Sequence, residues 1–248
     1  MVTNYSRPQT IQDAYNLLAK PHTFPLGGGT WLNQKQDEMM EMVDLQALGL
    51  NRIQKAGNNL EIDACVSLQQ LMETDECPQS LKQAIRLQAG LNIRNMATVA
   101  GTLVTCDGRS AFATVMLALD ARLTFFTDKN LVTESLGEFL PLRPRQLITK
   151  ITFPLNIRSA FETVARSPMD KPVVCAAVCT WPGGRTRLTL GGWGKTPVLA
   201  MDGTEAEGIE VAARNAYHEA GDAWASSDYR SDIAAILAKR CLKVISEN

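Results

Sequence analysis

IRNMATVAGTLVTCDGRSAFATVMLALDA, residues 93–121, is the stretch that decides the fold of this chain. Its first third places the small pair Ala100-Gly101 between the hydroxyl residues Thr98 and Thr102. Small residues beside hydroxyls allow a turn whose N–H groups can bind an anion. The same residues also fit a strand in which Gly101 marks a bulge. Residues 110–121 have the apolar pattern of a helix.

A second glycine-rich stretch, PLGGGTWLN at residues 25–33, lies upstream. Three consecutive glycines are costly in backbone entropy, which raises the question of what approaches this backbone too closely for a side chain. The stretch follows strand-like TFPL and precedes an expected short helix at 31–39, an arrangement that can bind phosphate. Neither G-x-G-x-x-G nor a Walker lysine is present, and a flexible surface turn is the alternative. Together, the two turns could close on one diphosphate.

The remaining pattern predicts an α+β chain in which the arrangement of expected helices and strands changes after Pro154. An N-cap at Thr10 and the capping box S-L-Q-Q at Ser67 mark two helix starts. Helices are expected at 11–18, from 67, at 79–89, at 209–224 and at 232–244. Strands are expected at 41–45, 60–66, 122–127 and 147–153, and a hairpin at 173–181 and 185–191. Residues 92–98 are expected to be irregular.

The composition argues against several classes of function. Twenty-five Lys and Arg residues against 26 Asp and Glu give a net charge of -1, so no basic surface for nucleic acid is expected. No apolar run is long enough for membrane insertion and no leader pattern is visible, so a cytoplasmic location is expected. Cys175 and Cys179 are expected to be buried thiols, and His22 and His218 are isolated, so no metal site is expected. No catalytic residues are expected either, because no acid–base constellation or nucleophile is visible.

Together, these motifs resemble the FAD-binding, or medium, subunit of the molybdenum hydroxylases, the family of xanthine dehydrogenase and carbon monoxide dehydrogenase. That family has A-G-G-T-D-L in a first loop and I-R-N-x-A-T-[IV]-G-G-N in a second, followed by L-x-A-L-D-A. This chain has GGT at 28–30, IRNMATVAG at 93–101 and LALDA at 117–121. QLITKITFP at 146–154 resembles the family's E-L-I-x-x-I-x-I-P, and DYR at 228–230 resembles its terminal S-x-Y-R. The resemblance spans nearly the whole chain in the right order.

The resemblance implies an FAD-binding fold of the PCMH type, with two α+β subdomains at about 1–52 and 53–157 and a C-terminal domain at 158–248. It also implies that both loops present N–H groups and hydroxyls to the FAD diphosphate. The first loop is then Pro25, Leu26, Gly27, Gly28, Gly29, Thr30, Trp31 and Leu32, and the second is Thr98, Val99, Ala100, Gly101 and Thr102. Ile148 falls where the family has an apolar residue against the flavin. Arg94 and Asn95 are expected to brace the second loop.

The chain departs from the family at several polar positions. Ala100 replaces the first of two glycines, Thr102 replaces an asparagine, and Trp31 stands where an acidic residue is common. The family's S-P-x-S-D becomes DGRSA at 107–111, so that Asp107 is the candidate substitute for the missing aspartate. Glu162 stands in place of a lysine, whereas Arg166 is retained. Each hydrogen bond lost would cost about 1 kcal/mol and would weaken FAD binding or alter the flavin potential.

The function that the resemblance implies is that of an oxidoreductase subunit which transfers electrons. Its partners would be a molybdopterin-binding large subunit, which selects the substrate, and a small subunit with two [2Fe–2S] clusters. The outer electron acceptor would be NAD or a quinone. One alternative is a degenerate scaffold or assembly subunit that keeps the fold without flavin. Another is the flavin reductases of cell-wall precursor synthesis, which share an LGGGTxLN likeness but have longer chains.

Overall fold

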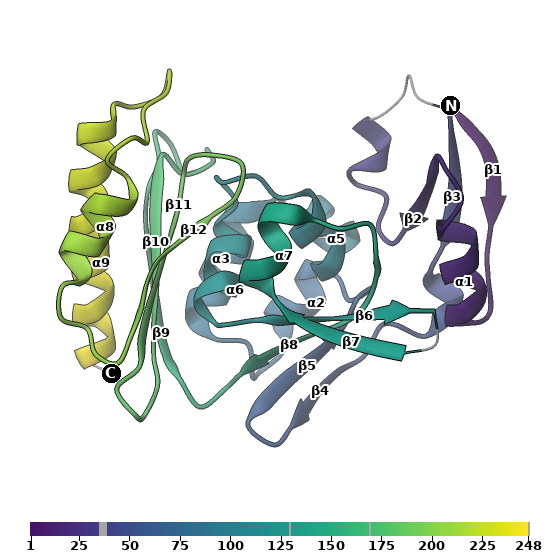
Figure 1. The fold of residues 1–248 in the computed structure, drawn as a ribbon, viewed down its shortest axis with the longest axis horizontal. Helices are drawn as coiled ribbons and strands as arrows, with labels where there is room; N and C mark the ends of the chain where they lie inside the picture. The colour runs from purple at the N-terminus through teal and green to yellow at the C-terminus, as the bar shows by residue number, and fades with distance from the viewer. Residues whose placement is uncertain (35–38, 129, 169, 248) are drawn as a thin grey trace. The chain divides into compact units, whose positions relative to one another are not determined.

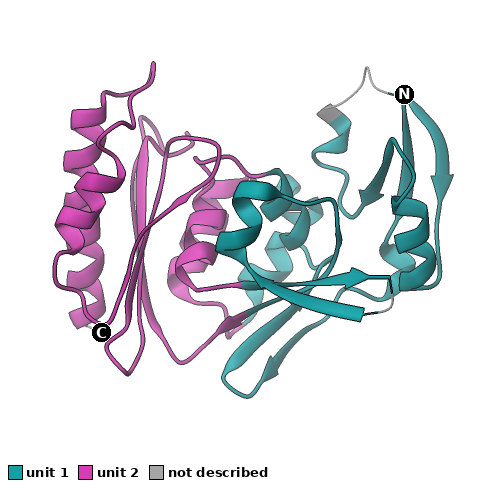
Figure 2. Ribbon diagram, viewed as in Figure 1, with its two compact units in different colours: residues 1–74, 91–105, 122–152 teal, residues 75–90, 106–121, 153–248 magenta. Residues whose placement is uncertain are grey.

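The computed structural model describes residues 1–34, 39–128, 130–168 and 170–247. The chain forms two compact units whose segments alternate along the sequence (Figure 2). Unit 1 comprises Met1–Thr74, Leu91–Thr105 and Arg122–Thr152, and unit 2 comprises Asp75–Gly90, Cys106–Ala121 and Phe153–Asn248. The mixture of helices and several sheets confirms the expected α+β class. Within these ranges no helix combines the length and the apolar character needed to cross a membrane.

Unit 1 begins with a parallel three-stranded sheet in the order β1-β3-β2 (Figure 1). Its strands are β1 (Val2–Ser6), β2 (Thr23–Leu26) and β3 (Met40–Asp44), and helix α1 (Ile11–Leu18) lies beside them. Helix α1 begins at the predicted cap, because Thr10 accepts a hydrogen bond from the N–H of Asp13. Since the strands are parallel, their carboxyl ends lie along one edge, and the first glycine loop leaves from that edge.

The second sheet of unit 1 has five strands in the order β4-β5-β8-β6-β7. These strands are β4 (Ile53–Ala56), β5 (Asn59–Asp63), β6 (Arg122–Thr127), β7 (Asn130–Ser135) and β8 (Leu147–Pro154). The unit also contains helices α2 (Leu68–Glu73), α4 (Leu91–Met96), α5 (Val99–Thr105) and α7 (Leu136–Leu142), and the 3-10 turns η1 (Leu32–Gln34) and η2 (Gln46–Leu48). Helix α2 starts with the predicted capping box, in which Ser67 and Gln70 exchange hydrogen bonds.

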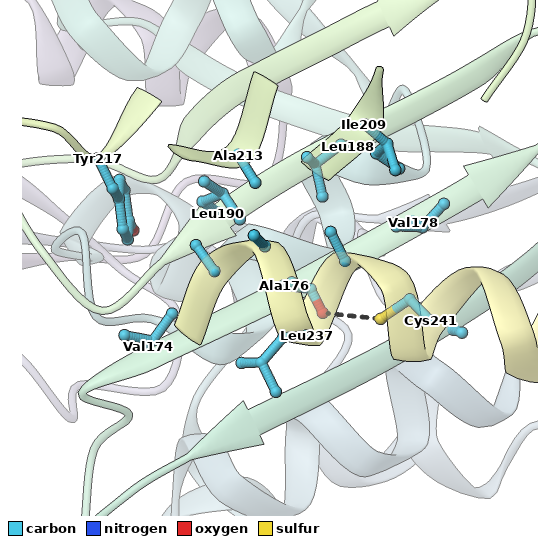
Figure 3. Close-up of a cluster of buried hydrophobic side chains, with 14 of the residues drawn as sticks. Val174, Ala176, Val178, Leu188, Leu190, Ile209, Ala213, Tyr217, Leu237 and Cys241 are labelled. Atoms are coloured by element: carbon cyan, nitrogen blue, oxygen red, sulfur yellow. Dashed lines mark hydrogen bonds between the residues drawn. The ribbon is translucent and has the colours of Figure 1, made fainter. Parts of the chain in front are cut away.

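Unit 2 is built on an antiparallel sheet in the order β12-β11-β10-β9. Its strands are β9 (Arg158–Val164), β10 (Val174–Thr180), β11 (Thr186–Gly191) and β12 (Val198–Gly203). Helices α8 (Ile209–Ala216) and α9 (Ser227–Glu247) pack on one face, and helices α3 (Gln79–Gln88) and α6 (Ala111–Ala118) pack on the other (Figure 1). Figure 3 shows the core beneath α8 and α9, where Cys241 donates a hydrogen bond to the carbonyl of Ala176. The expected hairpin and the buried thiols of Cys175 and Cys179 are confirmed.

Several local expectations need correction. Residues 92–98, expected to be irregular, mostly form α4, whose side chains include no buried residue and therefore give no amphipathic pattern. Gly101 lies inside α5 and does not mark a bulge. The strand expected at 60–66 ends at Asp63.

Two expected helices also differ in length from those in the structure. The helix expected at 209–224 ends at Ala216, and a turn follows in which the Asp222 carboxylate accepts a hydrogen bond from the N–H of Trp224. The last helix begins at Ser227, because Ser226 caps it. The helix expected at 31–39 is represented by the 3-10 turn η1, and residues 35–38 lie outside the described residues.

Candidate functional site

The first glycine loop meets the second segment backbone to backbone. A Cβ atom added at Gly28 would lie 1.6 Å from the carbonyl oxygen of Met96, and one added at Gly27 would lie 3.0 Å from the methyl group of Thr98. Gly29 has a φ of +70°, in the left-handed region that favours glycine. Contacts and backbone conformation within the protein therefore explain why each of these three positions is a glycine. Two allow the segments to touch and the third allows the turn.

The second segment enters helix α5 at Thr98. The side-chain oxygen of Thr98 accepts a hydrogen bond from the N–H of Gly101 at 3.1 Å, which is an N-cap interaction. A Cβ atom at Gly101 would lie 2.8 Å from that oxygen, so glycine leaves room for the cap. Ala100 is only 8% exposed, which means that its methyl group is turned into the protein. The methyl group of Ala100 therefore adds almost no bulk to the surface of this turn.

A hollow of about 590 Å³ opens beside the junction of the two segments, within unit 1. Gly27, Gly28 and Thr98 line it, together with Arg7, which directly follows β1, and Gln46, which follows β3. In open α/β sheets ligands bind outside the carboxyl ends of parallel strands, and this hollow lies at that edge of the three-stranded sheet. Its amide side chains belong to Gln46, Asn51, Gln69, Gln70 and Asn95. The hollow thus combines a glycine-rich backbone with many hydrogen-bonding groups.

The predicted site residues do not all lie at this hollow. Gly27, Gly28 and Thr98 line it, and Ile148 lies instead in β8, paired with Phe125 of β6 and 5% exposed. The other predicted residues of unit 1 follow one another along the two segments: Pro25 and Leu26 at the end of β2, Gly29, Thr30, Trp31 and Leu32 after it, and Val99, Ala100, Gly101 and Thr102 in the first turn of α5.

Asp107 belongs to unit 2, where it has partners of its own. Its carboxylate accepts hydrogen bonds from the Nζ of Lys171 at 2.7 Å and from the N–H of Arg109 at 3.0 Å. In unit 1, the Nε of Arg94 donates to the side-chain oxygen of Gln69 at 2.9 Å. This bond joins α4 to α2 beside the hollow, and the bracing of the second loop by Arg94 stays a prediction.

The sequence does not predict Arg7 and Gln46 as site residues. Strand β1 was not expected, because its residues are almost all exposed and show no alternation of apolar and polar side chains. Without β1, nothing in the sequence indicated that the residue after it would lie beside the glycine loop. The run of polar residues that begins at Ser67 predicts only a capping box, although Ser67, Gln69 and Gln70 also line the hollow.

The charged groups at this edge are few and unequally buried. Asp44, at the end of β3, is 3% exposed and accepts hydrogen bonds from the hydroxyl of Tyr5 at 2.5 Å and the N–H of Gln46 at 2.9 Å. The hydrogen bond to Asp44 raises the pKa of Tyr5. Burial raises the pKa of the Cys65 thiol to about 11, so this lining residue is a protonated thiol at neutral pH. Cys65 is therefore not an activated nucleophile, and the groups that line the hollow are suited to binding a ligand.

Comparisons with known proteins show the family to which this chain is similar. A sequence model of the family described as "FAD binding domain in molybdopterin dehydrogenase" matches residues 1–156. The chain is 26% identical over 246 residues to "Uncharacterized protein YgfM" of Escherichia coli K12, with 96% of this chain and 94% of that protein covered. It is 27% identical over 282 residues to "Xanthine dehydrogenase FAD-binding subunit" of Escherichia coli O157:H7, with 98% and 95% covered.

A similar fold occurs in a solved structure. The structure titled "Reconstituted CO dehydrogenase from Oligotropha carboxidovorans" contains a chain that matches this one with a TM-score of 0.82 and 23% identity. The match covers 98% of this chain and 96% of that chain. At this level of identity the likeness shows a shared fold.

Proposed function

The chain belongs to the family of FAD-binding domains of molybdopterin dehydrogenases, and on that basis we propose that it is the flavoprotein subunit of a molybdenum-containing hydroxylase or dehydrogenase complex. The observation that carries the proposal is the family match over residues 1–156, a region whose two predicted loops meet at one hollow. Family membership gives FAD as the cofactor and places the chain among the subunits of oxidoreductases.

The residues at the hollow fit a dinucleotide. Glycine at positions 27 and 28 leaves backbone at the wall of the hollow, and the hydroxyl residue Thr98 lies in the same wall, which suits an anionic diphosphate. Arg7 adds a positive charge. The amide groups of Asn51 and Asn95 offer donors and acceptors for a heterocyclic ring. These features support the proposal that the two segments hold the diphosphate of FAD.

The proposed role of the chain is to hold the cofactor on an electron-transfer route. FAD, when bound, supplies the ability to accept electrons one at a time and to release two. In the proposed complex, a molybdopterin-binding large subunit oxidises the substrate and a small subunit with [2Fe–2S] clusters delivers the electrons. An outer acceptor, NAD or a quinone, then receives them. In this proposal, the chain's own residues bind and orient the cofactor. Burial raises the pKa values of the Cys65 and Cys77 thiols.

Co-purification from the native host is the experiment that tests this proposal. The chain would be isolated with its partners, the partners identified by mass spectrometry and the absorbance spectrum recorded. We expect flavin absorbance together with a molybdopterin-binding subunit and a [2Fe–2S] subunit. Partners without flavin, even after incubation with FAD, would favour the scaffold alternative. Flavin with neither partner would contradict the assignment to such a complex.

A further inference from the structure

The geometry points to Arg7 as the counter-charge for the diphosphate of the bound dinucleotide, a role that rests on the proposed function. Arg7 is the one cationic residue among the described residues that line the hollow. A dinucleotide diphosphate carries two negative charges, and guanidinium groups bind phosphate oxygens through paired hydrogen bonds. A cation in this position would therefore contribute directly to affinity.

The position of Arg7 is fixed by the parallel sheet. Arg7 follows β1, Gly27 follows β2 and Gln46 lies just beyond β3, so three strands deliver these residues to the same edge. Pro8 comes next and is buried, and a proline restricts the preceding residue to an extended backbone. The arginine therefore leaves the sheet in a defined direction, at the same edge as Gly27 and Gly28, with the end of β3 between them, and all three residues line the hollow.

The guanidinium of Arg7 has N–H groups that donate no hydrogen bond to the described residues. Its side chain is 51% exposed, and its Nε lies 3.6 Å from Asp44, which is an ion pair beyond hydrogen-bonding distance. Both oxygens of that carboxylate already accept hydrogen bonds, from Gln46 and from Tyr5. Asp44 thus attracts the arginine without engaging its N–H groups in a hydrogen bond. A purely structural arginine would be expected to donate several hydrogen bonds to the protein, as Arg230 of unit 2 does.

The charges that line the hollow also differ from one side to the other. Glu73, the one acidic residue among the described lining residues, accepts a hydrogen bond from the amide of Gln69 at 2.7 Å. Arg7 comes from the three-stranded sheet, whereas Glu73 comes from α2. An anionic group is attracted to the arginine and the glycine backbone and is repelled by the glutamate. The diphosphate therefore belongs beside Arg7, and the uncharged parts of the ligand belong toward the amides of α2.

The test compares FAD with riboflavin, which has the flavin ring but no phosphate. Dissociation constants would be measured by fluorescence titration for the full chain and for Arg7→Ala, Arg7→Gln and Arg7→Lys. Arg52→Ala, which removes the same charge from an exposed side chain of unit 1 outside the hollow, is the matched control. We expect Arg7→Ala to weaken FAD binding about tenfold and to leave riboflavin binding unchanged. Arg7→Lys should recover part of the loss, and Arg52→Ala should match the wild type.

Salt dependence provides a second readout. Because the lost contact is ionic, FAD affinity of the wild type should fall more steeply with ionic strength than that of Arg7→Ala. Arg7→Gln retains a polar group near Asp44 and serves if the alanine variant unfolds. The inference is overturned if the wild type binds FAD and the Arg7 variants bind it as well as Arg52→Ala does. Equal losses for FAD and riboflavin would also overturn it. A wild-type chain that binds no FAD would overturn the proposed function as well.

Discussion

Gly28 has no room for a side chain, because its Cβ position lies 1.6 Å from the carbonyl oxygen of Met96. We expect Gly28→Ala to lower the free energy of unfolding by about 2 kcal/mol, because two backbone segments would have to separate. Urea unfolding followed by circular dichroism measures this change. FAD affinity should fall together with stability, since both segments line the same hollow.

Gly90 provides the control for this substitution. A Cβ atom at Gly90 meets nothing within 4 Å, and its φ is not in the left-handed region. Gly90→Ala should therefore change the free energy of unfolding by about 0.5 kcal/mol or less. Equal stability of the two variants would show that the contact between Gly28 and Met96 does not form in solution.

At the residue scale, the sequence predicts that something lies close to the backbone of the three glycines, but it does not identify that neighbour. Three glycines indicate that something approaches a backbone, and the pattern is the same whether that neighbour is a phosphate or a carbonyl group. Only the fold shows that the neighbour of Gly28 is Met96. Arg7 could not be predicted, because its place depends on β1 pairing with β3 over a separation that no local pattern reveals.

Helix α5 depends on one hydroxyl group at its start. Thr98 accepts a hydrogen bond from the N–H of Gly101 and is 9% exposed, so removing its oxygen leaves a helix N–H without its cap. We expect Thr98→Ala to cost about 1 kcal/mol in the free energy of unfolding and to weaken FAD binding. Thr98→Ser keeps the hydroxyl and should recover most of both losses. If serine were no better than alanine, packing of the threonine methyl group would be the cause.

A network of ion pairs joins β11 and β12 to the turn after α6. Arg185 donates to Asp202 at 2.8 and 2.7 Å, and both Arg185 and Arg187 contact Asp120. The hydrogen bond from Arg185 lowers the pKa of Asp202. A carboxyl group with a lowered pKa in the folded state stabilises the protein above its unfolded pKa of about 4, and this contribution is lost as the pH falls through the folded value.

Replacing Asp202 should therefore change the response to acid. We expect Asp202→Asn to lower the free energy of unfolding by about 1 kcal/mol at pH 7 and to lose less stability than the wild type between pH 5 and about pH 3. Urea unfolding at several pH values measures both effects. Asp75→Asn, at an exposed aspartate of the same unit, is the control and should follow the wild type. Parallel pH curves for Asp202→Asn and wild type would contradict the assignment.

At the scale of elements, the sequence predicted those with a local signal. The starts of α1 and α2 were marked by Thr10 and by Ser67 with Gln70, because capping uses residues within one turn. Helix α4 was missed because none of its side chains is buried, and the end of α8 was missed because a turn held by Asp222 follows it. Such features depend on tertiary contacts and turn chemistry more than on periodicity.

The whole chain is interwoven in a way that the sequence does not reveal. Helices α3 and α6 precede residue 157, yet they belong to the compact unit of the C-terminal sheet (Figure 2). All eight residues of α6 are buried, and Thr189 of β11 donates a hydrogen bond to the carbonyl of Thr114 in α6. The domain boundary near residue 157, which the sequence indicates, stays a prediction. The compact units show which segments depend on one another for burial.

This interleaving leads to a prediction about fragments. Residues 1–157 expressed alone should expose the apolar side chains of α6, because β10 and β11, which cover them, would be missing. We expect that fragment to bind the dye ANS and to sediment as aggregates, whereas the full chain should do neither. Co-expression of residues 158–248 should restore a dye-free complex, since it supplies the covering sheet. If residues 1–157 instead remained monomeric, bound no dye and unfolded cooperatively, α6 would not need the C-terminal sheet for burial.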